Sequence, residues 1–110
     1  LGDVYKRQTY ARGVELLQKR KYAKALYVLN DYNDRNTVVA HLSLDHNERA
    51  MELLATMPKD AVTEYLRAIA CSRLGRKAEG REHFLEACRL DGRMEYRGNL
   101  DPEIAELLKQ

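Results

Sequence analysis

Apolar residues recur along almost the whole chain at the three- and four-residue spacing of an amphipathic helix. Short polar corners separate the apolar runs. The pattern predicts runs from Tyr10 to Leu17 and Tyr22 to Tyr32, a short helix to about Leu44, and helices over Ala50–Leu54, about 60–74, 77 to about 90, and 102–109. Pro58 ends the fourth helix, because a proline inside a helix removes an amide donor and clashes with the preceding turn.

Several residues signal where these helices begin and end. Asp34 or Asn36 can cap the third helix, since short polar side chains accept hydrogen bonds from free amides in a first turn. Gly75 suits the left-handed residue that follows a helix. Asp101, Pro102 and Glu103 together form a strong start signal. The stretch 93–100 is less regular and predicts no clear element.

Composition narrows the class. The 110 residues are 45% hydrophobic and 33% charged, a mixture too apolar for a disordered tail and too charged for a membrane protein. Leu and Ala far outnumber Val, Ile and Thr, which favours helix over sheet. No apolar stretch is long enough to span a bilayer, so we expect no transmembrane segment. The prediction is one small all-α domain over residues 1–110.

Residues 61–92 resemble one tetratricopeptide repeat. The family has a small residue within its first helix and a Leu-Gly pair at the helix corner, followed by a small residue, an aromatic and an alanine in its second helix. This sequence places Ala68, Leu74-Gly75, Gly80, Phe84 and Ala87 there. Small side chains at these positions let antiparallel helices approach closely.

Two weaker units precede it. Residues 6–36 carry Gly13, Tyr22, Ala25 and Leu29 at related places, and residues 37–58 keep Ala50 and Leu54 after a shortened first helix. With 60–92 as the third unit and 102–109 as a capping helix, the resemblance implies a right-handed superhelix of hairpins with about seven helices. A generic helical bundle is the alternative.

The resemblance implies a protein-interaction scaffold that holds a peptide or a partner helix in a concave groove. Its groove-facing positions are Tyr10, Val14, Leu17, Val39, Leu42, Tyr65, Ile69, Ser72 and Arg73. This set is mostly apolar, so we expect an apolar or mixed ligand and no clamp for a terminal carboxylate.

An alternative is an assembly segment of a larger bacterial envelope protein, with the groove filled by its own chain or by a second copy. The first hairpin lacks a polar cap, which points to a homodimer through that hairpin or to a larger parent protein.

The ending Asn-Leu-Asp-Pro-Glu-Ile is similar to the tails of some bacterial repeat proteins associated with the outer membrane. We expect a location in the bacterial cytoplasm or periplasm. The opening LGDVYKRQ resembles translated adapter sequence, in which case residues 1–8 are not native.

No constellation of residues predicts catalysis, a cofactor or a metal site. Two histidines, His41 and His46, are five residues apart, so on one helix they would point about 140° away from each other. We expect Cys71 and Cys88 to be buried free thiols, because Cys88 falls opposite roughly Glu64, about 10 Å along the helix axis from Cys71.

The N-terminal part of the chain, 1–30, holds seven basic and two acidic side chains together with four of the seven tyrosines. Tyrosines interleaved with cations can bind single-stranded nucleic acid. However, Tyr22, Tyr27 and Tyr32 are five residues apart and spiral around a helix instead of forming one platform. We therefore expect a protein partner and no nucleic acid.

Overall fold

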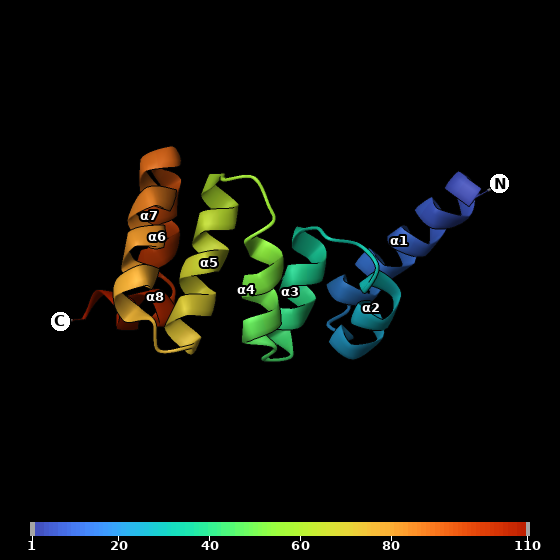
Figure 1. Cartoon of the computed structure of the whole chain (residues 1–110), viewed down its shortest axis with the longest axis horizontal. Coiled ribbons are helices and arrows are strands. Elements are labelled where there is room, and N and C mark those ends of the chain that lie inside the picture. Colours follow the sequence, from blue (N-terminus) through green and yellow to red (C-terminus); the bar gives the residue numbers. More distant parts are fainter. Residues whose placement is uncertain (1, 110) are drawn as a thin grey trace. The chain divides into compact units, whose positions relative to one another are not determined.

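The computed structural model describes the backbone of residues 2–109 and the side chains of residues 4–109, and this part of the chain forms eight α-helices and no strand (Figure 1). The helices are α1 (Gly2–Gln18), α2 (Tyr22–Leu29), α3 (Arg35–Ser43), α4 (Asn47–Leu54), α5 (Ala61–Arg73), α6 (Lys77–Leu90), α7 (Arg93–Asn99) and α8 (Pro102–Leu108). The all-α class is confirmed for these residues. None of these helices combines the length and the apolar character needed to cross a membrane. Leu1, part of the segment predicted to be non-native, lies outside the described residues.

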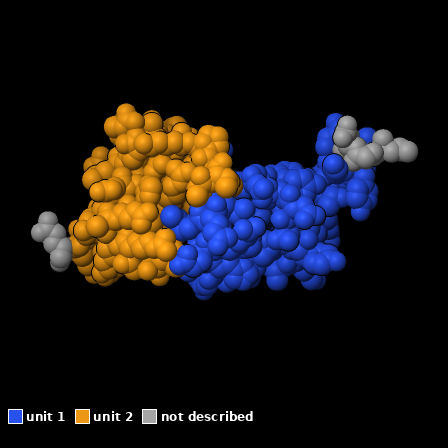
Figure 2. Space-filling view, in the orientation of Figure 1, with its two compact units in different colours: residues 1–53 blue, residues 54–110 orange. Residues whose placement is uncertain are grey.

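The helices group into two compact units, residues 1–53 and residues 54–110 (Figure 2). Unit 1 contains α1, α2, α3 and nearly all of α4, and unit 2 contains α5 to α8. The boundary falls inside the second expected repeat, 37–58. Each unit has its own cluster of buried apolar side chains.

One type of corner recurs after α1, α3 and α5. In each corner one residue has left-handed backbone, with φ of 60°, 60° and 77° at Arg20, Asp45 and Gly75. The next amide donates to the carbonyl five residues back, in the pairs Lys21–Leu16, His46–His41 and Arg76–Cys71. This is the Schellman arrangement that ends a helix. The left-handed residue predicted at Gly75 is confirmed, whereas the other two corners use residues that give no glycine signal.

Three aspartates cap the helices that follow longer turns. Asp34 and Asp60 accept hydrogen bonds from the amides of Thr37 and Thr63, at 3.1 and 2.7 Å. Asp101 caps α8 by accepting from the Glu103 amide at 3.0 Å, with proline following it as predicted. Of the two caps considered for the third helix, Asp34 is the one used.

The core of unit 1 lies between α1 and α2 and consists of Leu16, Ala25 and Leu29. Gly13 allows this packing, because a Cβ built on it would come within 2.6 Å of the Leu29 side chain. The small residues predicted at 13 and 25 therefore stand where the two helices are closest. Tyr10, Leu17, Val28 and Tyr32 pack around this core.

The core of unit 2 is larger and joins α5 and α6 to the C-terminal helices. It contains Tyr65, Ala68, Ile69, Phe84, Ala87, Met94, Ile104 and Leu107. Gly80 lies at the closest approach, since a Cβ on it would meet Leu107 at 2.9 Å and the Cys71 Cβ at 3.1 Å. The helix predicted over 102–109 is α8, and it packs on both α5 and α6.

The one helix missing from the sequence prediction is α7, which raises the number of helices from about seven to eight in the described residues. Its seven residues bury only Met94 and Gly98, too few for a visible periodic pattern. Gly98 faces the ring of Phe84, and a Cβ there would come within 2.4 Å of the ring. Packing against α6 and α8, not helix propensity, holds this segment.

We predict that Gly98→Ala lowers the free energy of unfolding by about 1–3 kcal/mol, because the added methyl forces the Phe84 ring to move inside a packed core. Gly92→Ala is the matched control. Nothing lies within 4 Å of a Cβ at Gly92, and its φ of −57° suits alanine. Urea unfolding of both variants measures the difference. Equal midpoints for the two variants would contradict the close packing of α7.

Candidate functional site

Tyr65 and Ile69, which the sequence predicts to face a partner from α5, lie inside the core of unit 2. They are 2% and 7% exposed and belong to the same cluster as Ile104 and Leu107 of α8. Beside them, the guanidinium of Arg97 stacks 4.6 Å from the centre of the Tyr65 ring. In this unit the chain's own C-terminal helices cover the apolar part of the predicted groove face.

The two polar residues predicted for the same face are also used within unit 2. Ser72 Oγ donates to the carbonyl of Glu103 at 3.3 Å. Arg73 forms a bidentate ion pair with the Glu103 carboxylate, in which Nε and Nη2 each lie 2.9 Å from one carboxylate oxygen. Such a bidentate pair fixes geometry as well as adding energy. These contacts hold α8 against α5.

In unit 1 most of the predicted residues are more accessible than Tyr65 and Ile69. Val14 and Leu17 of α1 and Val39 of α3 are half-buried, whereas Leu42 of α3 is 6% exposed. Tyr10 is half-buried and belongs to a polar cluster at the start of α3. The nine predicted residues thus divide between the units, with five in unit 1 and four in unit 2.

Tyr10 and Tyr65 make the same contact in the two units. Each stands ten residues before the left-handed residue of its corner, and each hydroxyl donates to an aspartate that caps a later helix. Those aspartates are Asp34 and Asp101. Burial, reinforced by the neighbouring carboxylate, raises the pKa of both tyrosines. The aspartate that caps α8 is therefore bound to α5 by the same type of contact that binds the aspartate capping α3 to α1.

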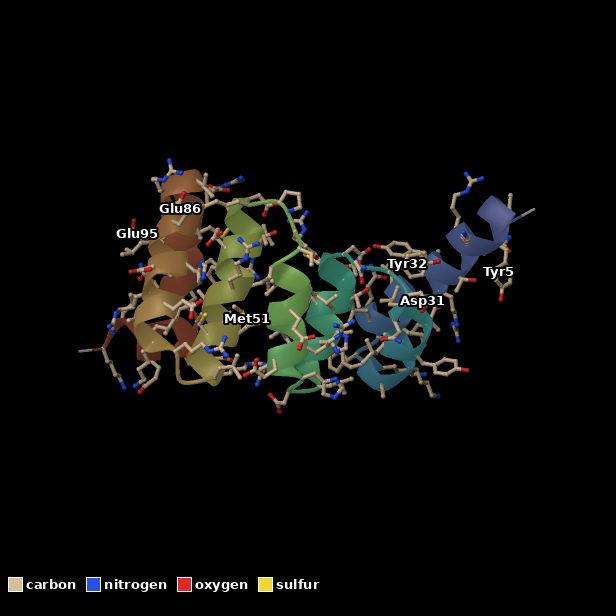
Figure 3. All side chains as sticks on the ribbon, in the orientation of Figure 1. Tyr5, Asp31, Tyr32, Met51, Glu86 and Glu95 are labelled. Carbon is tan, nitrogen blue, oxygen red and sulfur yellow. The ribbon has the colours of Figure 1, made fainter. Side chains whose placement is uncertain are left out.

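Unit 1 has two surface hollows beside α2. The first, which we call the α1 hollow, has a volume of about 390 Å³ and is lined by Tyr5, Lys6, Thr9, Val28, Asp31 and Tyr32. Figure 3 labels Tyr5, Asp31 and Tyr32 there. The second, the α2 hollow, has a volume of about 490 Å³ and is lined by Ala23, Leu26, Tyr27, Asn30, Asp31, Leu44 and His46. All residues that line the α2 hollow lie outside the segment 1–8.

Tyr27 gives the α2 hollow a feature that the sequence analysis missed. It is 89% exposed, the highest fraction among the exposed large apolar side chains of the described residues. An exposed aromatic beside a hollow of mixed apolar and polar lining is typical of a binding surface. The acidic Asp31 and the C-terminal end of α2 add negative charge at the edge of the hollow.

His41 and His46 contact each other, contrary to the expectation that they point apart. Their Nδ1 atoms are 3.2 Å apart and their ring centres 5.4 Å apart. The expectation assumed one continuous helix, but α3 ends at Ser43 and the left-handed Asp45 turns the chain back. Burial lowers the pKa of His41, and the nearby His46 and Arg49 lower it further.

Both cysteines are free thiols, with Cys71 buried and Cys88 half-buried. Glu64 lies opposite His83, with Nδ1 to Oε2 at 2.6 Å, and not opposite Cys88 as the expected register placed it. Glu64 is 2% exposed and also pairs with Arg67.

In the described part of the chain, one group of side chains has metal-ligand spacing, namely Cys71, Glu79 and His83. Sequence spacing does not predict this group, because its three residues come from two helices, α5 and α6.

No protein-family model, curated protein or solved structure matches this chain.

We predict that Tyr65→Phe lowers the free energy of unfolding. The Tyr65 hydroxyl donates to the Asp101 carboxylate at 2.7 Å, and the tyrosine is almost fully buried. Loss of a hydrogen bond to a charged group in such a setting costs about 1–3 kcal/mol of stability. Urea unfolding measures the change.

Tyr96→Phe is the control for this substitution. Tyr96 is 71% exposed. Its replacement should change the free energy of unfolding by at most about 0.5 kcal/mol, as surface substitutions usually do. Equal stability of the two variants would show that the Tyr65–Asp101 contact does not hold α8 in place.

Protonation of His41 should make the protein less stable in acid. Its pKa is lowered in the folded chain from the ordinary 6.5, so the unfolded chain binds a proton more readily as pH falls below that value. The stabilisation is therefore complete above pH 6.5 and is lost on acidification. His41→Leu places at 41 the residue type that Leu16 supplies before the first corner, and should flatten this dependence. Parallel urea midpoints of the wild type and the variant between about pH 7 and 5 would contradict it.

Proposed function

We propose that the chain is a protein-interaction module, without enzymatic activity, built from tetratricopeptide-like helical hairpins. Two features support the resemblance, the recurring Schellman corner and the small residues at the closest helix approaches. The left-handed residues Arg20, Asp45 and Gly75 follow one another at the same sequence intervals as the small residues at 25, 50 and 80. The right-handed stacking of hairpins implied by the family is part of this proposal.

We place the partner-binding surface on unit 1, in the α2 hollow. The main support for this placement is Tyr27, a large aromatic side chain that is 89% exposed beside a hollow of about 490 Å³. The apolar walls formed by Ala23, Leu26 and Leu44 suit an apolar side chain of the partner. The carboxylate of Asp31 suits a basic one next to it.

The proposed ligand is therefore a short peptide segment with an aromatic or aliphatic residue beside a lysine or arginine. This modifies the groove assignment made from sequence. Val14, Leu17 and Val39 remain accessible in unit 1, whereas Tyr65 and Ile69 are enclosed in unit 2. A partner that needs Tyr65 and Ile69 would have to displace α8.

Selection of random peptides displayed on phage, with the tag-free chain as target, tests this proposal. We expect the selected peptides to share an apolar residue followed or preceded by a basic one. Tyr27→Ala should weaken the binding of a synthetic selected peptide at least about tenfold, since exposed aromatics at the centre of an interface contribute most of its energy. Tyr96→Ala, an exposed tyrosine of unit 2, should leave binding unchanged.

A specific observation favours the assembly segment as the second candidate. The face of α5 is already filled by α7 and α8, as that alternative requires. If no peptide sequence is enriched, or if Tyr27→Ala and Tyr96→Ala bind a selected peptide equally well, the interaction module is wrong and the assembly segment is favoured.

A further inference from the structure

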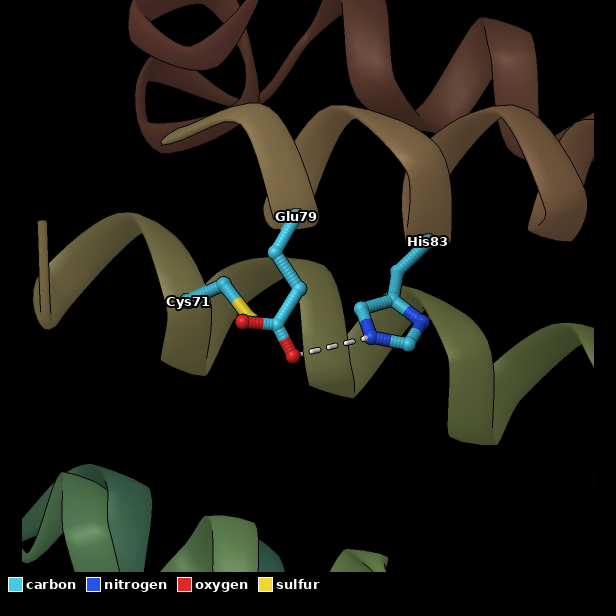
Figure 4. A group of neighbouring side chains, drawn as sticks. All are labelled: Cys71, Glu79 and His83. Atoms are coloured by element: carbon cyan, nitrogen blue, oxygen red, sulfur yellow. Dashed lines mark ion pairs between the residues drawn. The ribbon is translucent and has the colours of Figure 1, made fainter. Parts of the chain in front are cut away.

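Three side chains of metal-binding types converge between the facing helices α5 and α6 (Figure 4). Cys71 comes from α5, and Glu79 and His83 lie one turn apart on α6. A thiol sulfur, a carboxylate oxygen and an imidazole nitrogen from these residues all lie within 4.8 Å of one another. Because all three belong to the closely packed α5–α6 hairpin, their backbone positions are fixed by the core of unit 2.

The orientation of His83 leaves its second nitrogen facing the other two residues. Nδ1 lies 2.6 Å from Oε2 of Glu64, and a carboxylate can only accept, so Nδ1 carries the hydrogen. Nε2 then faces Glu79 Oε1 at 3.8 Å. A histidine that donates one N–H to a buried carboxylate while the other nitrogen faces further ligands has the arrangement of metal-binding histidines.

The carboxylate that orients His83 is itself rigidly held. Glu64 is paired with the guanidinium of Arg67, and their side chains are 3% and 12% exposed. Arg67 also donates to the carbonyls of Leu54 and Met57, at 2.6 and 3.1 Å. Every member of this supporting layer has partners, so the imidazole ring has little freedom to turn away.

The charges around Cys71 favour a cation. Burial, together with the carboxylates of Glu79 and Glu64, raises the pKa of the Cys71 thiol to about 11, and Arg76 opposes this only in part. Without a cation the thiol therefore keeps its proton. A bound divalent cation would stabilise the thiolate and release that proton to solvent, as metal binding by cysteine does generally.

We propose that Cys71, Glu79 and His83 bind a divalent transition-metal cation, with Zn²⁺ as the best match. Thiolate and imidazole ligands favour Zn²⁺ over Mg²⁺ and Ca²⁺, which prefer oxygen. Ligands at about 2.0–2.3 Å in a tetrahedron stand roughly 3.3–3.7 Å apart. His83 Nε2 and Glu79 Oε1, at 3.8 Å, are already close to this spacing, and the Glu79 side chain is 49% exposed and free to adjust.

Metal binding by the tag-free, reduced and chelator-stripped chain tests the proposal. We expect one Zn²⁺ per chain by calorimetry, and Co²⁺ should give a thiolate charge-transfer band with the visible bands of tetrahedral coordination. Zn²⁺ should also raise the melting temperature, reversibly with EDTA. Mg²⁺ should do none of this.

The variants separate this site from adventitious binding. Glu79→Gln and His83→Gln change accessible side chains and should each weaken Zn²⁺ binding at least about tenfold, and Cys71→Ser should abolish the charge-transfer band. Cys88→Ser, on α6 outside the cluster, should bind Zn²⁺ as the wild type does. Absence of saturable Zn²⁺ binding to the wild type would overturn the proposal. So would binding that survives Glu79→Gln and His83→Gln together. Neither result bears on peptide binding by the α2 hollow.

Discussion

Close approach of paired helices is the constraint on which the rest of this structure depends. It requires side chains of almost no volume where the helices are nearest. Gly13 lets Leu29 fill the interface in unit 1, and Gly80 lets Leu107 and Cys71 do so in unit 2. At this distance the packed residues interlock and the corners must be tight, which explains the left-handed residues at Arg20, Asp45 and Gly75.

The same close approach determines which polar side chains meet between the helices and which helix faces stay exposed. In unit 2 it brings the facing sides of α5 and α6 together, so that His83 hydrogen-bonds Glu64 and the thiol of Cys71 lies within 4.8 Å of ligand atoms of Glu79 and His83. It also leaves the outer face of α5 to be covered by α7 and α8. In unit 1 most of the corresponding residues of α1 and α3 are less enclosed, and Tyr27 of α2 stays in solvent.

The sequence was most informative about local structure. Helix limits follow from signals a few residues long, such as Asp101-Pro102 and Gly75. Pro58 does not mark the end of α4, which lies four residues earlier at Leu54. What the sequence could not show depended on contacts between distant residues. The α7 helix is held by packing of Gly98 on Phe84, and the histidine pair is made by a left-handed aspartate that has no glycine signal. The groove positions on α5 rest on the family resemblance, and no local pattern reveals that α8 packs over Tyr65.

The covered face of α5 and the open face of α2 differ most in the exposure of one tyrosine on each, Tyr65 and Tyr27. Hydroxyl-radical footprinting of the intact chain, read out by mass spectrometry at individual tyrosines, measures it directly. Tyr27 should react about as fast as a tyrosine in an unfolded peptide, and Tyr65 should be almost unreactive, as their exposures of 89% and 2% require. Equal reactivity of Tyr27 and Tyr65 would contradict this difference in exposure.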